Sequence, residues 1–151
     1  EGQAKKRERD FPLLELDLQE RPEHPFPQFN MGMTLYHVGR QGEAIPFLHN
    51  SISLAGPDDS HLRKSFALLA ACHLALGRRA DALSAMNHGL AAVPGDAELL
   101  FMRGRYFMEE GDRERALADL ANMRLDDDGF RSLDIGVLTV GRDQLLRELL
   151  A

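Results

Sequence analysis

The chain has 151 residues, the length of one domain or of one short repeat array, and its net charge is −6. No apolar run approaches the ~18 residues of a membrane span, and the N-terminus does not resemble a signal peptide. The acidic charge argues against a general nucleic-acid binder, which needs a basic face, and a single cysteine excludes an internal disulfide framework. Because the chain begins with Glu1 rather than Met, we expect it to be a processed product or a fragment.

Small and apolar residues recur along the chain at two fixed spacings. Gly32, Ala70 and Gly104 are separated by 38 and then 34 residues. Three further columns share these spacings; they are Gly39, Gly77 and Gly111, then Ala44, Ala82 and Ala116, then Leu48, Met86 and Leu120. Four independent columns with one pair of spacings predict a 34-residue repeat, with extra residues around Gly56–Ser60.

A period of 34 residues with this order of small, apolar and glycine positions resembles the tetratricopeptide repeat, a helix–turn–helix unit. The resemblance covers repeats at 25–56, 63–96 and 97–128, with a half-repeat in 1–24 and a capping helix in 129–151. It implies an all-α, right-handed superhelical solenoid. The chain departs from the family pattern at Arg103, which replaces an apolar residue. Of the prolines that end each repeat in the family pattern, only Pro94 has a clear match here. The position that usually carries a large aromatic ring in this family is occupied here by Leu35, His73 and Phe107.

Eight helices and no strands are predicted. The first continues the repeat backwards, because Leu14 and Leu18 lie 34 residues before Leu48 and Ile52. The last carries an apolar stripe and is expected to cover one end of the array. A mid-helix glycine such as Gly32 is unfavourable by about 1 kcal/mol and suits a close helix crossing, whereas Gly39 follows a helix as a helix-ending glycine does. In chain order the helices are 5–20, 26–39, 42–55, 60–77, 80–93, 96–110, 113–125 and 136–150.

In the tetratricopeptide family the first helices of successive repeats line a concave groove in which partner peptides lie. The corresponding residues would offer apolar surface, an amide for a peptide backbone, and cations for negative groups. Asn30 is the strongest candidate, because an amide has little other reason to lie on an inner helix face. The alternative is that Phe29, Met33 and Phe101 are half-buried core. The groove positions are Phe29, Asn30, Met33 and His37, then Lys64, Ala67, Leu68 and Ala71, then Phe101, Met102 and Arg105.

Other kinds of site have little support in the sequence. Of the six histidines, no two stand three to five residues apart on one helix, so no metal site is predicted. Cys72 is expected to be a small buried hydrophobe, and His73 to replace a packed ring. Asp126–Asp128 could mimic the Asp-x-Asp of a sugar-nucleotide transferase, but they are expected to be solvated turn residues. We therefore predict no cofactor, no metal and no catalytic residue.

Several short segments carry a narrower resemblance. They are Arg9-Asp10, Leu13-Leu14-Glu15, Glu20-Arg21-Pro22, Pro25-Phe26, Phe29-Asn30, Gly32-Met33-Thr34 and Ser60-His61-x-Arg63-Lys64. Together they resemble the tetratricopeptide region that follows the catalytic domain in some bacterial family 2 glycosyltransferases. This resemblance implies a parent protein whose catalytic domain precedes Glu1, so that no residue of this chain performs glycosyl transfer.

These observations favour a non-catalytic, cytoplasmic interaction scaffold that binds a partner protein or peptide in the groove, and neither nucleic acid nor membrane. One alternative is an accessory region of a family 2 glycosyltransferase that positions the acceptor or the catalytic domain. A second alternative is a self-association module, in which exposed end helices stack between copies of the chain to form a homo-oligomer.

Overall fold

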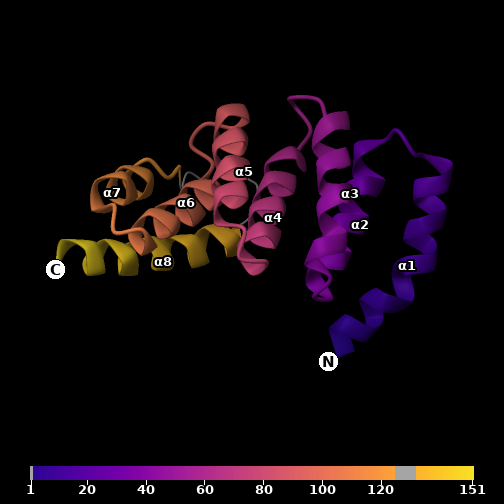
Figure 1. Ribbon diagram of the computed structural model, residues 1–151, viewed down its shortest axis with the longest axis horizontal. Coiled ribbons are helices and arrows are strands. Elements are labelled where there is room, and N and C mark those ends of the chain that lie inside the picture. Colours follow the sequence, from indigo (N-terminus) through magenta and orange to yellow (C-terminus); the bar gives the residue numbers. More distant parts are fainter. Residues whose placement is uncertain (1, 125–131) are drawn as a thin grey trace. The chain divides into compact units, whose positions relative to one another are not determined.

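The computed structural model describes residues 2–124 and 132–151, and within these residues it consists of eight α-helices without a strand (Figure 1). The all-α prediction is therefore confirmed. The observed helices begin and end within four residues of the predicted bounds, and the largest differences are at the start of the last helix and the end of the one before it. The helices are α1 (Gly2–Glu20), α2 (Pro25–His37), α3 (Gln41–Leu54), α4 (Leu62–Ala75), α5 (Arg79–Ala92), α6 (Ala97–Glu109), α7 (Arg113–Ala121) and α8 (Ser132–Leu150).

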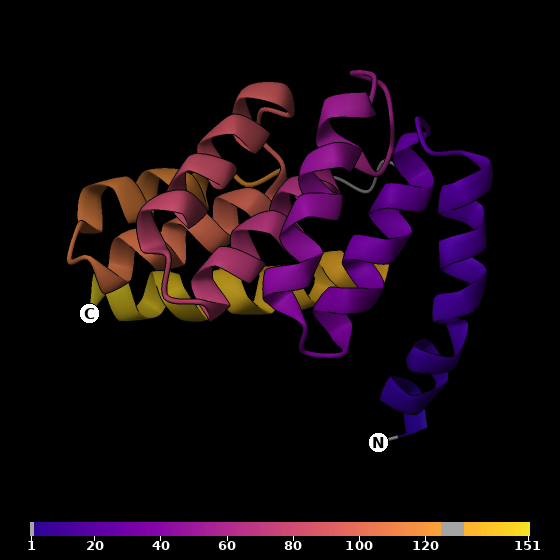
Figure 2. The ribbon, with the colours of Figure 1, turned by 45° about the vertical axis from the view of Figure 1, so that its right-hand side comes forward.

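The chain divides into two compact units, an N-terminal unit (Glu1–Ala85) and a C-terminal unit (Met86–Ala151), with the boundary inside α5. In the N-terminal unit α1 packs on α2, α2 packs on α3, and α4 contacts both α2 and α3 (Figure 2). In the C-terminal unit α6 packs on α7, and α8 contacts both. Each unit thus contains a helix pair joined by a tight turn and a following helix that lies against both members.

The same turn ends α2, α4 and α6. Gly39 has a left-handed backbone with φ of 84°, and the N–H of Arg40 donates a 2.9 Å hydrogen bond to the carbonyl of Leu35. The turns at Gly77 and Gly111 repeat this arrangement, with the equivalent hydrogen bond at 2.8 Å in each. This is the Schellman motif, which satisfies the last carbonyls of a helix and favours glycine because a Cβ is strained at positive φ. The glycine column therefore has the helix-ending role that the sequence predicts.

A glycine lies at the crossing inside each helix pair. A Cβ added at Gly32 would stand 2.8 Å from Cγ and Cδ2 of Leu48, and one added at Gly104 would stand 3.1 Å from the same atoms of Leu120. Both leucines are fully buried. The first and fourth columns of the repeat thus meet in both pairs, and the missing side chain lets the two helices approach closely.

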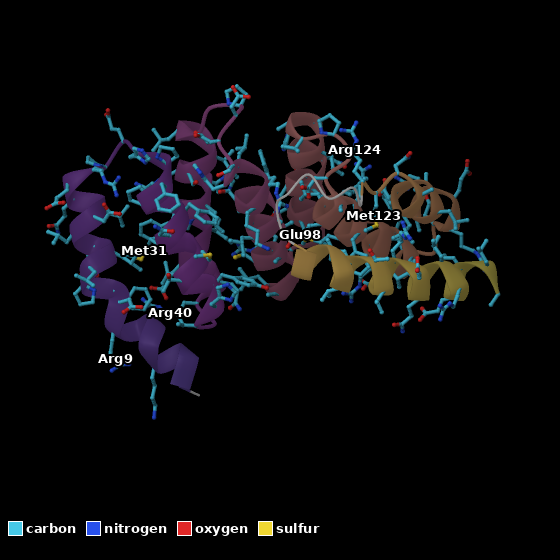
Figure 3. All side chains as sticks on the ribbon, turned by 180° about the vertical axis from the view of Figure 1, so that it is seen from behind. Arg9, Met31, Arg40, Glu98, Met123 and Arg124 are labelled. Atoms are coloured by element: carbon cyan, nitrogen blue, oxygen red, sulfur yellow. The ribbon has the colours of Figure 1, made fainter. Side chains whose placement is uncertain are left out.

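Helix α1 is anchored to its unit along one side. Phe11 and Leu18 are half-buried on that side, and the guanidinium of Arg40 lies 5.3 Å from the centre of the Phe11 ring. Figure 3 shows Arg40 reaching toward α1 and Met31 lying between α1 and α2. Pro12 lies inside α1 and has no N–H to donate, and the helix bends in its first half (Figure 1).

One guanidinium connects three helices in the C-terminal unit. Arg103 on α6 donates from Nε and Nη2 to the two carboxylate oxygens of Asp119 on α7, at 2.8 and 2.7 Å, and from Nη1 to Oδ1 of Asn87 on α5 at 2.7 Å. Asp119 is buried, whereas the Arg103 side chain keeps 23% of its surface exposed. The hydrogen bond to Asp119 raises the pKa of Arg103. This paired charge accounts for an arginine where the other repeats carry an apolar residue.

Candidate functional site

The eleven predicted groove residues are divided between the two units. Those on α2 and α4 belong to the N-terminal unit, and those on α6 belong to the C-terminal unit. Three of them are buried in the core and cannot offer surface to a ligand in this structure; they are Phe29, Ala67 and Leu68. Six are half-buried; they are Asn30, Met33, Lys64, Ala71, Phe101 and Met102. The two exposed residues are His37 and Arg105.

The accessible residues of α2 share one face of that helix. Asn30, Met33 and His37 follow a spacing of three and then four residues, which brings side chains together on a helix. No hydrogen bond joins the Asn30 amide to another described residue. Because α4 packs directly on α2, Lys64 and Ala71 lie on the neighbouring helix of the same unit. An amide, a thioether, an imidazole and an ammonium are therefore carried, partly accessible, by two adjacent helices.

An aromatic cluster lies at the start of α2. The rings of Phe26 and Phe29 are stacked with their centres 6.3 Å apart, and the His61 ring lies 5.5 Å from Phe29 and 6.0 Å from Phe26. Phe26 is 45% exposed although it is a large apolar side chain. The groove prediction omitted Phe26, yet its position four residues before Asn30 places it on the same face of α2, and that spacing could have identified it.

The connection between α3 and α4 places His61 in this cluster. The N–H of Gly56 donates to Oδ2 of Asp59 at 2.7 Å, and the N–H of Asp59 donates to the carbonyl of Gly56 at 3.1 Å, so the extra residues predicted here form a closed turn. The Ser65 hydroxyl donates a 3.1 Å hydrogen bond to the backbone carbonyl of His61. Nε2 of His61 is buried without a hydrogen-bond partner among the described residues. Burial lowers the pKa of His61, Asp59 opposes this, and His24 adds to it.

His73 on α4 occupies the ring position of the second repeat and is buried, at 7% exposure. Its Nδ1 has no hydrogen-bond partner within the described ranges. Burial lowers the pKa of His73; Asp81 acts in the opposite direction, and His49 and Arg78 lower the pKa further. The structure therefore favours the neutral imidazole at this position, as expected for a histidine that replaces a packed ring.

We expect acid to destabilise the protein partly through His73. Its pKa is lower in the folded than in the unfolded chain, so the unfolded chain takes up the proton first as the pH falls below 6.5. The stability contributed by the neutral ring is complete above that pH and is lost as the pH falls through the folded pKa. Urea unfolding measured between pH 7.5 and 5 should show a smaller loss of stability in His73→Phe than in the wild type. Equal pH dependence in the two proteins would contradict this, and the lowered pKa of His61 leaves a residual effect in both.

In the C-terminal unit α8 covers part of the predicted groove surface of α6. The ring of Phe101 lies against Gly141, where an added Cβ would stand 2.9 Å from Cε2 and Cζ. Gly141 thus gives the ring room to pack beneath α8. Met102 keeps some accessible surface beside it, and Arg105 is exposed.

Among the described residues, Cys72 and the possible metal ligands were the other candidates for a site. Burial raises the pKa of Cys72 to about 11, so the thiol is protonated and inert at neutral pH. No group of three His, Cys, Asp or Glu residues in residues 2–124 and 132–151 could hold a metal ion. Asp126–Asp128 lie outside the described residues. No described helix is both long and apolar enough to cross a membrane.

The repeat in the sequence is the main evidence for the family that this chain resembles. No model of a protein family matches the chain, and no curated protein matches it. The tetratricopeptide relationship therefore stays a prediction, based on the four columns and the helix–turn–helix order of the chain.

Proposed function

We propose that this chain is a non-catalytic tetratricopeptide-repeat module that binds an extended segment of a partner protein along α2 and α4. One observation carries the proposal: the half-buried amide of Asn30 has no hydrogen bond to another described residue on a helix that α4 packs against. A partly desolvated amide of this kind can hold a peptide backbone through both its donor and its acceptor.

The neighbouring side chains define the chemistry of the partner. Phe26 and Met33 offer apolar surface on the same face of α2 as Asn30, and Met adapts to irregular apolar partners. Lys64 on α4 supplies a cation, which favours an acidic group in the bound segment and sets its direction more than its affinity. The proposed ligand is therefore an extended peptide with apolar side chains and a carboxylate.

The test uses a peptide selected against the 151-residue chain from a random display library, with its Kd measured by fluorescence anisotropy. We expect Asn30→Ala to raise the Kd about fivefold to tenfold, the effect of losing one or two net hydrogen bonds. Lys64→Glu should weaken acidic peptides most strongly at low salt. Asn122→Ala is the matched control, because Asn122 is an exposed asparagine beyond the end of α7, and it should bind as the wild type does.

Two outcomes would contradict the proposal. In one, repeated selections yield no peptide that binds the folded chain. In the other, the selected peptides bind Asn30→Ala and Lys64→Glu as tightly as the wild type. Circular dichroism of each variant separates a binding defect from unfolding, since neither change removes a buried side chain.

A further inference from the structure

The side of α1 that faces away from its own unit carries an exposed apolar pair. Leu13 is 69% exposed and Leu16 is 50% exposed, which is unusual for two leucines one helical turn apart. The half-buried Phe11 and Leu18 occupy the opposite side, where α1 packs on α2. Figures 1 and 2 show no other helix of the N-terminal unit beyond this outer side of α1.

Two charges of opposite sign flank the leucine pair at equal distances. Arg9 lies four residues before Leu13, and Glu20 lies four residues after Leu16. The four positions follow the spacing of one helix face, and both charged residues are exposed. Figure 3 shows Arg9 extending away from the ribbon. We call Arg9, Leu13, Leu16 and Glu20 the outer α1 face.

This face is complementary to itself when its direction is reversed. In an antiparallel pair of α1 helices centred between Leu13 and Leu16, Leu13 of one copy meets Leu16 of the other. Arg9 of each copy then lies opposite Glu20 of the other, so two ion pairs border the apolar contact. A parallel pair would instead place arginine against arginine and glutamate against glutamate, which is unfavourable. The charge pattern thus favours a second copy of α1 as the partner and an antiparallel orientation of the two helices.

We propose that the outer α1 face is a dimerisation surface for a second copy of this chain, joined through antiparallel α1 helices about a two-fold axis. An isologous contact of this kind needs no partner with a separately matched sequence, because every residue is used twice. The contact is one helix wide and belongs to the small, weak class of interfaces. It shares no residue with the proposed ligand contacts on α2 and α4, and so goes beyond that function.

The experiment is sedimentation equilibrium of the 151-residue chain up to about 1 mM, the concentration at which an association with a 1 mM Kd becomes substantial. We expect a dimer that weakens with added salt, and a monomer throughout the range for the double variant Leu13→Ser/Leu16→Ser. Circular dichroism should show the same helix content in both, since the two leucines are exposed.

Charge reversal tests the direction of pairing. Arg9→Glu alone and Glu20→Arg alone each create two like-charge contacts per dimer, and each should raise the dimer Kd at least about tenfold. The double variant Arg9→Glu/Glu20→Arg restores both pairs and should return the Kd to within about threefold of the wild type. Glu15→Arg is the matched control, because Glu15 is an exposed acidic residue of α1 outside this face, and it should leave the Kd unchanged.

A wild-type chain that stays monomeric to about 1 mM would overturn the proposal. The outer α1 face would then contact another segment or another protein. The proposal would also be overturned if the dimer Kd does not change in the single charge-reversal variants, or if the double variant does not restore it. Failure here is distinguishable from failure of the proposed function, because the variants of α1 should still bind the selected peptide, whereas Asn30→Ala should still dimerise.

Discussion

Replacing Gly32 by leucine is expected to lower the free energy of unfolding by about 3 kcal/mol, the upper end of what overpacking usually costs. The first added atom alone would stand 2.8 Å from Cγ and Cδ2 of Leu48, and the backbone nitrogen of Leu48 lies 3.4 Å from the same point. Leu48 is fully buried, so it has no open space into which it can turn. The two helices must therefore separate. Urea unfolding followed by circular dichroism measures the loss.

A series of glycine-to-alanine variants provides the control for this result. Gly32→Ala should destabilise more than Gly104→Ala, since the contacts to the opposing leucine are 2.8 and 3.1 Å. Gly42 lies in the first turn of α3 with nothing within 4 Å of its added Cβ, so Gly42→Ala should be neutral or stabilising by up to about 1 kcal/mol. If all three variants have the same stability, the close crossings do not limit side-chain size.

Replacing Arg103 by methionine is expected to cost about 2 to 3 kcal/mol. The change leaves the buried carboxylate of Asp119 without its two hydrogen bonds and its counter-charge. Breaking a buried pair costs more than this when both partners are fully desolvated; the exposed fraction of Arg103 reduces the effect. Thermal and urea unfolding of the variant measure the loss.

Two further variants distinguish the effect of leaving the Asp119 carboxylate unpaired from the effect of losing the packing of the Arg103 side chain. Arg103→Lys should recover only part of the stability, because an ammonium cannot form the two parallel hydrogen bonds of a guanidinium. Arg103→Met/Asp119→Leu should recover most of it, since it removes the unpaired carboxylate as well. A double variant no more stable than Arg103→Met would show that the carboxylate is not the source of the cost.

Much of the fold could be predicted because it depends on local sequence. The Schellman turns need a glycine just after a helix, and the 34-residue period locates Gly39, Gly77 and Gly111 without any knowledge of tertiary structure. The end of α7 could not be located in this way. The N–H of Arg124 donates to the carbonyl of Gly95 at 3.2 Å, so a contact with a distant loop competes with continuation of the helix.

The candidate site was less predictable, because a repeat position gives the helix face and not the exposure. Phe29, Ala67 and Leu68 occupy groove positions of the family pattern but are buried. For Phe29 the cause is visible: His61 packs on its ring, and the turn between Gly56 and Asp59 brings His61 there. That turn belongs to the residues that interrupt the period, about which the repeat carries no information.

The hydrogen bonds of Arg103 also restrict how α7 can slide along α6. A slip of one turn would replace Asp119 by Ala116 or Met123, which are close to one turn away on α7 and just beyond its end. The packing of Leu120 on Gly104 opposes such a shift, because the residues one turn away from Gly104 on α6 are large. The guanidinium opposes it as well, since it would face a methyl group or a thioether in place of two carboxylate oxygens. The ion pair between Arg103 and Asp119 thereby favours a single alignment of α6 and α7.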